Sequence, residues 1–157
     1  MPRPVSRAPL GARAIAAQAA GLAATYALAA AVGPSIHALP TFPLLAAGVF
    51  CGVALIAISY LHNHPFAQFG PANLVTTVRV VAVSLVVALI GESRTPAAAW
   101  TAAIGGCVST LLDGVDGWLA RRSGLASEFG ARYDMEIDAL LILALCGLAW
   151  QHEKAGA

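Results

Sequence analysis

The sequence predicts an all-α polytopic membrane protein with about five transmembrane helices. Of its 157 residues, 59% are hydrophobic and 11% are charged, which exceeds the apolar fraction of ~45–50% in soluble domains. Asp, Glu, Lys and Arg are absent from residues 14–78, 80–91 and 95–112, and about 20 apolar residues suffice to span a bilayer as a helix. The formal net charge of +1 and the apolar composition exclude a disordered tail and a polybasic nucleic-acid module.

The first predicted helix covers residues 14–32, an alanine-rich run that follows Arg3, Arg7 and Arg13. A basic start before an apolar run is also typical of a signal peptide, which would be cleaved near residues 29–33. The run is longer than the usual apolar part of a signal peptide, and this length favours a retained membrane anchor.

Prolines mark the turn before the second predicted helix, which covers residues 42–61. Residues 62–72 are expected to form a loop or a short surface helix, because two prolines and a glycine interrupt the pattern. In this segment His62 and His64 are expected to be solvated turn residues, with a metal-binding pair as the alternative. The third predicted helix covers residues 73–90.

The fourth predicted helix covers residues 96–119 and runs past its apolar part into polar sequence. The fifth covers residues 130–150 and precedes a polar tail. The three cysteines lie in apolar runs without metal-ligand spacing, so we expect buried, small hydrophobic side chains rather than redox or zinc sites. They are Cys51, Cys107 and Cys146.

The positions of Lys and Arg predict the orientation, because cytoplasmic loops of membrane proteins are enriched in both. A cytoplasmic N-terminus places most arginines on or near that side: Arg3, Arg7, Arg13, Arg79, Arg121, Arg122 and Arg132. Arg94 and Lys154 then fall on the other side. Cleavage of the first helix would leave the other helices in the same orientation, so the loop between the fourth and fifth helices is predicted to be cytoplasmic.

Six of the eight acidic residues lie between positions 113 and 138. Asp113 and Asp116 are three residues apart at the inner end of the fourth helix, and Asp134 and Asp138 are four apart at the start of the fifth. Both spacings place the paired carboxylates on one face of a helix, and a short turn would let the two faces confront each other. Four such carboxylates would repel one another unless a cation lay between them.

Carboxylate oxygens are ligands that Mg²⁺ and Mn²⁺ prefer, and four aspartates are enough to hold two ions. We therefore expect a metal site at the cytoplasmic ends of helices four and five. The alternative is that these are ordinary interfacial charges at two helix ends. Acidic side chains within or near hydrocarbon are costly and are functional as a rule, which favours the metal site.

Small residues leave room beside these aspartates. Gly117 and Ala120 share a face with Asp113, and Gly130 lies one turn before Asp134. Two neighbouring arginines could bind a phosphate, and these are Arg121 and Arg122. The pattern therefore fits a bulky ligand that carries phosphate.

This arrangement resembles the signature of the CDP-alcohol phosphotransferase (CDP-alcohol phosphatidyltransferase) family. The resemblance holds at eight defined positions with their spacings: Asp113, Asp116, Gly117, Ala120, Arg121, Gly130, Asp134 and Asp138. Residues 73–79, with the sequence NLVTTVR, also look like the start of the first core helix of the family. The resemblance covers about residues 63–150.

The resemblance implies transfer of a phosphatidyl or other phosphoalcohol group from a CDP-alcohol, most simply CDP-diacylglycerol, to an alcohol acceptor. CMP would be released, and the reaction would belong to phospholipid biosynthesis. Two ions, Mg²⁺ or Mn²⁺, would be bound by Asp113, Asp116 and Asp134. Asp138 would complete the second metal site and act as the general base on the acceptor hydroxyl.

The resemblance also implies a set of contacts to the CDP part of the donor. They are Thr76, Thr77, Val78, Arg79, Gly117, Arg121 and Ser127. For Arg79 the alternative is a side chain that extends along the helix to the membrane surface. The expected partners are a CDP-linked lipid donor, an alcohol acceptor and membrane lipid, without nucleic acid, and a homodimer is left open. The expected location is the cell (inner) membrane, with the active site facing the cytoplasm.

Members of this family resemble a six-helix core with the signature between its second and third helices. Residues 63–157 would supply the first three core helices, and residues 1–62 would be an N-terminal extension with two transmembrane helices. A fragment, a truncated gene product and a chain that needs a partner for the remaining half all stay open. The competing functions are a divalent-cation transporter or channel subunit and an inactive family member. Aspartates gathered at one membrane face argue against the transporter.

Overall fold

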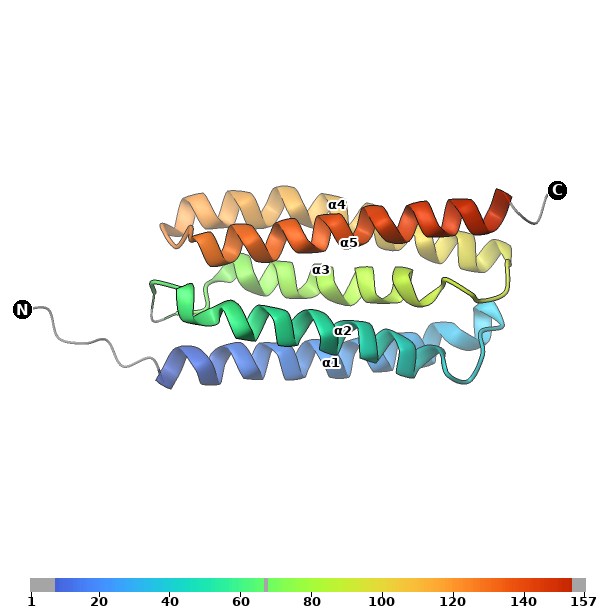
Figure 1. Cartoon of the computed structure of the whole chain (residues 1–157), viewed down its shortest axis with the longest axis horizontal. Helices are drawn as coiled ribbons and strands as arrows, with labels where there is room; N and C mark the ends of the chain where they lie inside the picture. The colour runs from blue at the N-terminus through green and yellow to red at the C-terminus, as the bar shows by residue number, and fades with distance from the viewer. Residues whose placement is uncertain (1–7, 67, 154–157) are drawn as a thin grey trace, which may run out of the picture.

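The computed structural model describes residues 8–66 and 68–153, which form an elongated bundle of α-helices (Figure 1). The helices are α1 (Ala8–Ile36), α2 (Phe42–Tyr60), α3 (Pro71–Ala88), α4 (Pro96–Ser123) and α5 (Glu128–Glu153), with a short 3₁₀ helix, η1, at Leu61–Asn63. All five α-helices run side by side along the length of the molecule. The predicted all-α fold is confirmed, and α1 and α4 are longer than their predicted ranges.

Local backbone signals explain where α4 begins and where α1 and α4 end. Thr95 caps α4, since its side chain accepts a hydrogen bond from the backbone N–H three residues later. Gly124, with φ of 66°, ends α4 in the left-handed conformation. His37, with φ of 53°, follows the last residue of α1 and ends that helix in the left-handed conformation as well. The N–H of Ala38 then donates to the carbonyl of Gly33 at 3.0 Å. These helices therefore continue beyond their apolar runs until a left-handed residue stops them.

The central helix is α3, which packs against α1, α2, α4 and α5. Its valines at positions 80, 83 and 86 are fully buried. On one side α4 comes close at Gly105, where a Cβ atom would lie 2.6 Å from the Val86 side chain. Small residues allow such close approach between helices in membranes. This central position brings the polar residues of α3 between the other helices.

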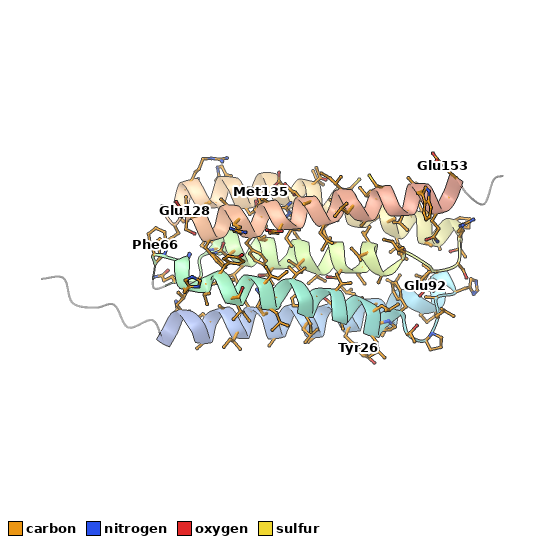
Figure 2. The ribbon with its side chains drawn as sticks, in the orientation of Figure 1. Tyr26, Phe66, Glu92, Glu128, Met135 and Glu153 are labelled. Carbon is orange, nitrogen blue, oxygen red and sulfur yellow. The ribbon has the colours of Figure 1, made fainter. Side chains whose placement is uncertain are left out.

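Four helices in the described part of the chain are long and apolar enough to cross a membrane: α1 from Leu10, α2, α3 and α4. Large apolar side chains cover the outside of the bundle, and Tyr26 and Met135 illustrate this at 49% and 67% exposure (Figure 2). Exposed apolar surface of this extent fits a lipid environment. The chain is therefore an integral membrane protein.

The fifth helix differs from its prediction, because α5 is not among these four candidate spans. Its first half carries five charged side chains, which lower its hydropathy: Glu128, Arg132, Asp134, Glu136 and Asp138. It nevertheless runs beside the others and packs on α3.

The expectation for the cysteines is wrong in part. Cys51 is half-buried, whereas Cys107 and Cys146 are exposed on the outside of the bundle. An apolar side chain in a membrane helix can face lipid as readily as protein, so an apolar sequence run does not decide which of the two it contacts.

Candidate active site

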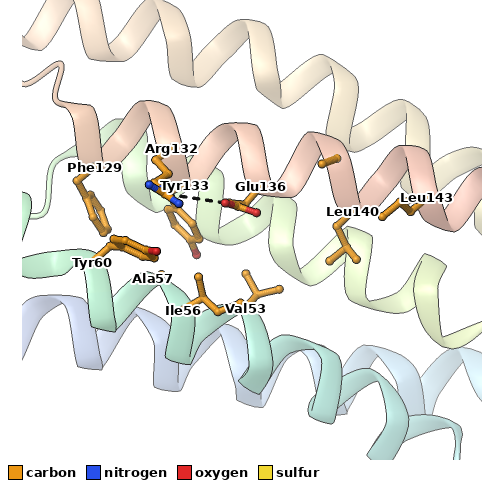
Figure 3. A pocket seen from close by; sticks show the side chains of 11 residues that line it. Val53, Ile56, Ala57, Tyr60, Phe129, Arg132, Tyr133, Glu136, Leu140 and Leu143 are labelled. Carbon is orange, nitrogen blue, oxygen red and sulfur yellow. Dashed lines mark ion pairs between the residues drawn. The ribbon is translucent and has the colours of Figure 1, made fainter.

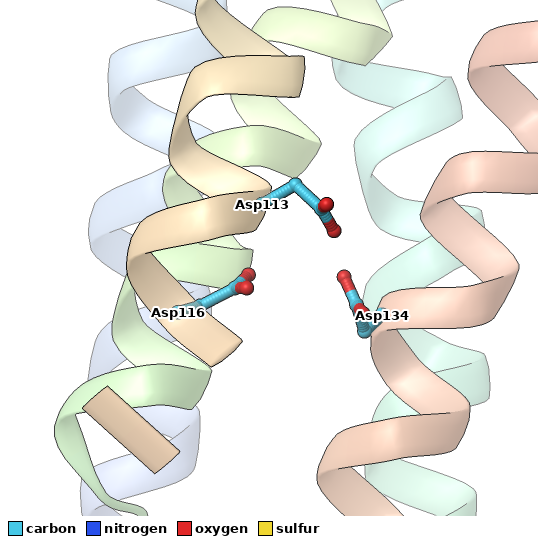
Figure 4. Close-up of side chains that lie close together, drawn as sticks. All are labelled: Asp113, Asp116 and Asp134. Atoms are coloured by element: carbon cyan, nitrogen blue, oxygen red, sulfur yellow. The ribbon is translucent and has the colours of Figure 1, made fainter. Parts of the chain in front are cut away.

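Three helices contribute acidic or basic side chains to one site. Asp113 and Asp116 on α4 and Asp134 on α5 point toward one another (Figure 4). One carboxylate oxygen from each lies within 4.8 Å of the others. The pairing predicted from residue spacing is therefore present in the fold, because the tight loop between α4 and α5 brings the two helix faces together.

A buried arginine from α3, Arg79, lies at the centre of these carboxylates. Its Nη1 is 3.1 Å from Asp113 Oδ1 and 3.1 Å from Asp116 Oδ2. The guanidinium also pairs with Asp134 through Nη1 and with Asp138 through Nη2. The side chain of Arg79 is 0% exposed. The alternative in which Arg79 extends to the membrane surface is therefore wrong.

The charges in this cluster do not balance. Four ionised carboxylates and one guanidinium sum to a formal charge of −3 (−4 and +1). Buried or half-buried charges of one sign repel strongly unless they are neutralised. The donor set is oxygen from carboxylates alone, which suits Mg²⁺ or Mn²⁺ rather than a softer metal. The residues present therefore fit a divalent cation, and the guanidinium shows that the position already favours positive charge.

The four carboxylates differ in exposure. Asp116 is buried, at 5% of its side-chain surface, and it accepts a hydrogen bond from Thr76 Oγ1 at 3.0 Å. The side chains of Asp113, Asp134 and Asp138 are 44%, 34% and 47% exposed. One carboxylate is thus fixed inside the bundle, and three face an open side that a ligand can reach.

A cavity of about 230 Å³ adjoins the aspartates between α3, α4 and the start of α5. Asp116 and Asp134 form part of its wall. Arg121 lines it as well and lies close to Gly117, where a Cβ atom would be 3.4 Å from Arg121 Nη1. The absence of a side chain at Gly117 therefore leaves room for the guanidinium beside the carboxylates.

Of the residues predicted to contact the CDP part of the donor substrate, the structure brings some together at the cavity and places others elsewhere. Thr76, Gly117, Arg121 and Ser127 all line the cavity. Thr77 instead donates to the carbonyl of Asn73 and lies 3.4 Å from the hydroxyl of Tyr133. Val78 is 54% exposed on the outside of α3. Neither Thr77 nor Val78 is among the described lining residues, because a helix directs successive side chains to different sides.

Two residues near the cavity were missed as site residues by the sequence analysis. Asn73 lines the cavity and donates from its side chain to the carbonyl of Phe69. His64 is 2% exposed, so the expected solvated turn is wrong. Its Nδ1 lies 3.0 Å from Ser127 Oγ. The sequence shows only a histidine in the loop before α3. Loop residues have no periodicity that indicates burial, so the sequence offered no signal that this side chain is buried.

Comparison with known proteins adds one finding. The model of the CDP-alcohol phosphatidyltransferase family matches residues 69–156. This range contains α3, α4 and α5 with all four aspartates, and α1 and α2 lie outside it. No curated protein and no solved structure matches the chain.

Proposed function

The chain belongs to the CDP-alcohol phosphatidyltransferase family, and we propose that it transfers a phosphatidyl group from CDP-diacylglycerol to an alcohol, releasing CMP. Transfer of a phosphoalcohol group from a CDP-alcohol is the activity of the family. The observation that carries the proposal is the convergence of Asp113, Asp116 and Asp134 beside a cavity that also contains Arg121. A donor that is itself a membrane lipid accounts for a transferase built from membrane helices.

The proposed metal ligands are Asp113, Asp116 and Asp134, with Asp138 completing a second site, and the ions are Mg²⁺ or Mn²⁺. When bound, two such ions would supply positive charge to the donor diphosphate and to the departing CMP. Support comes from the surplus negative charge and from the exposure of three of the carboxylates. Arg79 is proposed to hold the acidic side chains together from the buried side rather than to contact CDP.

Asp138 is proposed to act as the general base. Its side chain is 47% exposed, so an acceptor hydroxyl can approach it. The carboxylate accepts the proton of the acceptor hydroxyl while the acceptor oxygen forms a bond to the donor phosphorus that carries the diacylglycerol. The bond from that phosphorus to the bridging oxygen breaks, and CMP leaves with the bridging oxygen.

The cavity is proposed to bind the cytidine and phosphate part of the donor. Arg121 can pair with a phosphate in a two-pronged manner, and Thr76 and Ser127 offer hydroxyl groups. The site is proposed to face the cytoplasm from the inner membrane of the cell. The division into an extension at 1–62 and a partial core at 63–157 remains a proposal.

The test is CMP release by the purified chain reconstituted in lipid nanodiscs. CDP-diacylglycerol is supplied with glycerol phosphate, inositol phosphate or serine, in Mg²⁺, in Mn²⁺ and in EDTA. The expected result is metal-dependent CMP release with one acceptor. Release that persists in EDTA would contradict the metal site, and no release with any acceptor would contradict the proposed activity of this chain.

A further inference from the structure

His64 lies in the loop between η1 and α3, just before the residues that the family model matches. Its side chain reaches the loop between α4 and α5, where Nδ1 lies 3.0 Å from Oγ of Ser127. On the other edge of the ring, Nε2 lies 2.8 Å from the carbonyl oxygen of Gln68. His64 is 2% exposed, so both ring nitrogens form their hydrogen bonds inside the protein.

Two phenylalanine rings pack against this imidazole. The ring centroids of Phe66 and Phe129 lie 5.6 and 5.3 Å from that of His64, both in an edge-to-face arrangement. Phe129 is itself buried and points from α5 toward Tyr60 at the end of α2 (Figure 3). None of the described contacts of His64 is with a carboxylate. A buried charge without a partner is costly, so this surrounding favours the uncharged ring.

The two hydrogen bonds assign the tautomer of the uncharged ring. A carbonyl oxygen only accepts, so Nε2 carries the proton and donates it to Gln68. Nδ1 then has a lone pair and no proton, so it can only accept. The hydroxyl of Ser127 therefore donates to His64.

Ser127 immediately precedes α5 and caps it. Its Oγ accepts a hydrogen bond from the N–H of Gly130 at 3.1 Å. A hydroxyl group has one proton and two lone pairs. With the proton given to His64 and one lone pair to Gly130, one lone pair of Ser127 remains. Ser127 and Gly130 both line the cavity beside the aspartates, and a Cβ at Gly130 would lie 3.5 Å from Ser127 Oγ. The absence of a side chain at Gly130 therefore leaves this oxygen uncovered.

We infer that His64 is a positioning residue that fixes Ser127 as a hydrogen-bond acceptor toward the cavity. The hydroxyl proton is directed to His64, so the oxygen offers a lone pair, and no proton, to a ligand. This inference rests on the proposed function, in which the cavity binds cytidine. The group recognised is a hydrogen-bond donor of cytidine, which is the amino group of the base or a ribose hydroxyl.

The test is calorimetric titration of CDP into the full chain in nanodiscs with Mg²⁺. His64→Phe keeps an aromatic ring against Phe66 and Phe129 but removes both nitrogens. Ser127→Gly removes the hydroxyl, and glycine is well tolerated at a helix N-cap. Each variant should lower CDP affinity about 5–10-fold, as the loss of one hydrogen bond predicts. The double variant should lose no more than one single variant does, because both act through one oxygen.

Two analogues identify the recognised group. UDP lacks the amino group of the base, and 2′,3′-dideoxy-CDP lacks both ribose hydroxyls. One of them should bind the wild-type chain about 5–10-fold more weakly than CDP does, and it should bind Ser127→Gly as well as it binds the wild type. A merely structural role of Ser127 would not give this result, because a distorted cavity would weaken binding of CDP and of both analogues. Equal binding of CDP and both analogues to the wild type would overturn the inference.

A matched control is His152→Phe. His152 is an exposed histidine in the last turn of α5, and it is not among the described residues that line the cavity. The same substitution at this position should leave CDP affinity unchanged. Losses that multiply in the double variant of His64 and Ser127 would overturn the positioning role.

Nitrogen NMR of His64 gives a second readout that does not depend on binding. We expect the proton on Nε2, and a proton on Nδ1 would overturn the inference. A wild-type chain that bound no CDP would contradict the proposed function, and the role of Ser127 as an acceptor for cytidine would fail with it. The tautomer of His64 would still show whether Ser127 donates to it, so the two failures can be told apart.

Discussion

Arg79 Nη1 lies 3.1 Å from Asp116 Oδ2, and this ion pair joins α3 to α4 inside the bundle with both side chains buried. The same guanidinium contacts Asp134 and Asp138 on α5. One side chain therefore connects the three helices of the site. Its Nε has no hydrogen-bond partner among the described residues, so binding is concentrated on the two terminal nitrogens.

Replacing Arg79 by Gln should destabilise the chain and make its stability depend on metal. Removing one partner of a buried charge pair costs about 3–5 kcal/mol, because the other charges stay unpaired. In thermal unfolding in detergent, we expect Arg79→Gln to unfold at a lower temperature in EDTA and to gain more from Mg²⁺ than the wild type does. Arg79→Lys retains the charge and should lose less. A variant as stable as the wild type in EDTA would contradict this role.

Asp113 and Asp138 should differ when each is changed to Asn. Asp113→Asn removes a proposed metal ligand, so it should raise the Mg²⁺ concentration needed for half-maximal binding of a CDP-lipid. Asp138→Asn removes the proposed base, so it should leave donor binding nearly intact and lower turnover by ~10²–10⁴. Titrating CDP-lipid affinity against metal for both variants checks this. Equal loss of donor affinity in the two would make Asp138 a metal ligand of the same weight as Asp113, without a separate role as base, and would leave the base unassigned.

Gly130→Ala should disturb the contact between α5 and α3. A Cβ atom at Gly130 would lie 3.0 Å from Asn73 Oδ1, and the buried Asn73 side chain is held by its bond to Phe69. We expect a loss of about 1–3 kcal/mol in stability, typical of overpacking, together with weaker CDP binding. Gly48→Ala is the control, since a Cβ there meets nothing within 4 Å. It should be neutral or stabilising by up to ~1 kcal/mol. The same result for both glycines would count against the close contact.

The orientation can be tested by labelling single cysteines. Ser123→Cys lies at the end of α4 beside Arg121 and Arg122, and Ser93→Cys lies at the opposite end of that helix, next to Arg94. Both serines are exposed. With the native cysteines replaced, a membrane-impermeant thiol reagent should label position 93 in intact cells and position 123 only after the membrane is opened. Labelling of position 123 in intact cells would reverse the proposed orientation.

Periodic and compositional features could be read from the sequence. Charge-free runs predicted the membrane helices, because helix length and apolar composition are local properties. The i, i+3 and i, i+4 spacings predicted which aspartates share a face. The motif around Asp113 and Asp134 predicted the family that the match to residues 69–156 supports.

Only the tertiary structure decided what the buried polar residues contact. The sequence left Arg79 with two alternatives, and the packing of α3 at the centre of the bundle placed its guanidinium among four carboxylates from two other helices. It likewise turned Thr77 toward Tyr133 and buried His64 against Ser127. These contacts join residues 34 to 63 positions apart, and such pairings depend on how whole helices pack, which no local pattern encodes.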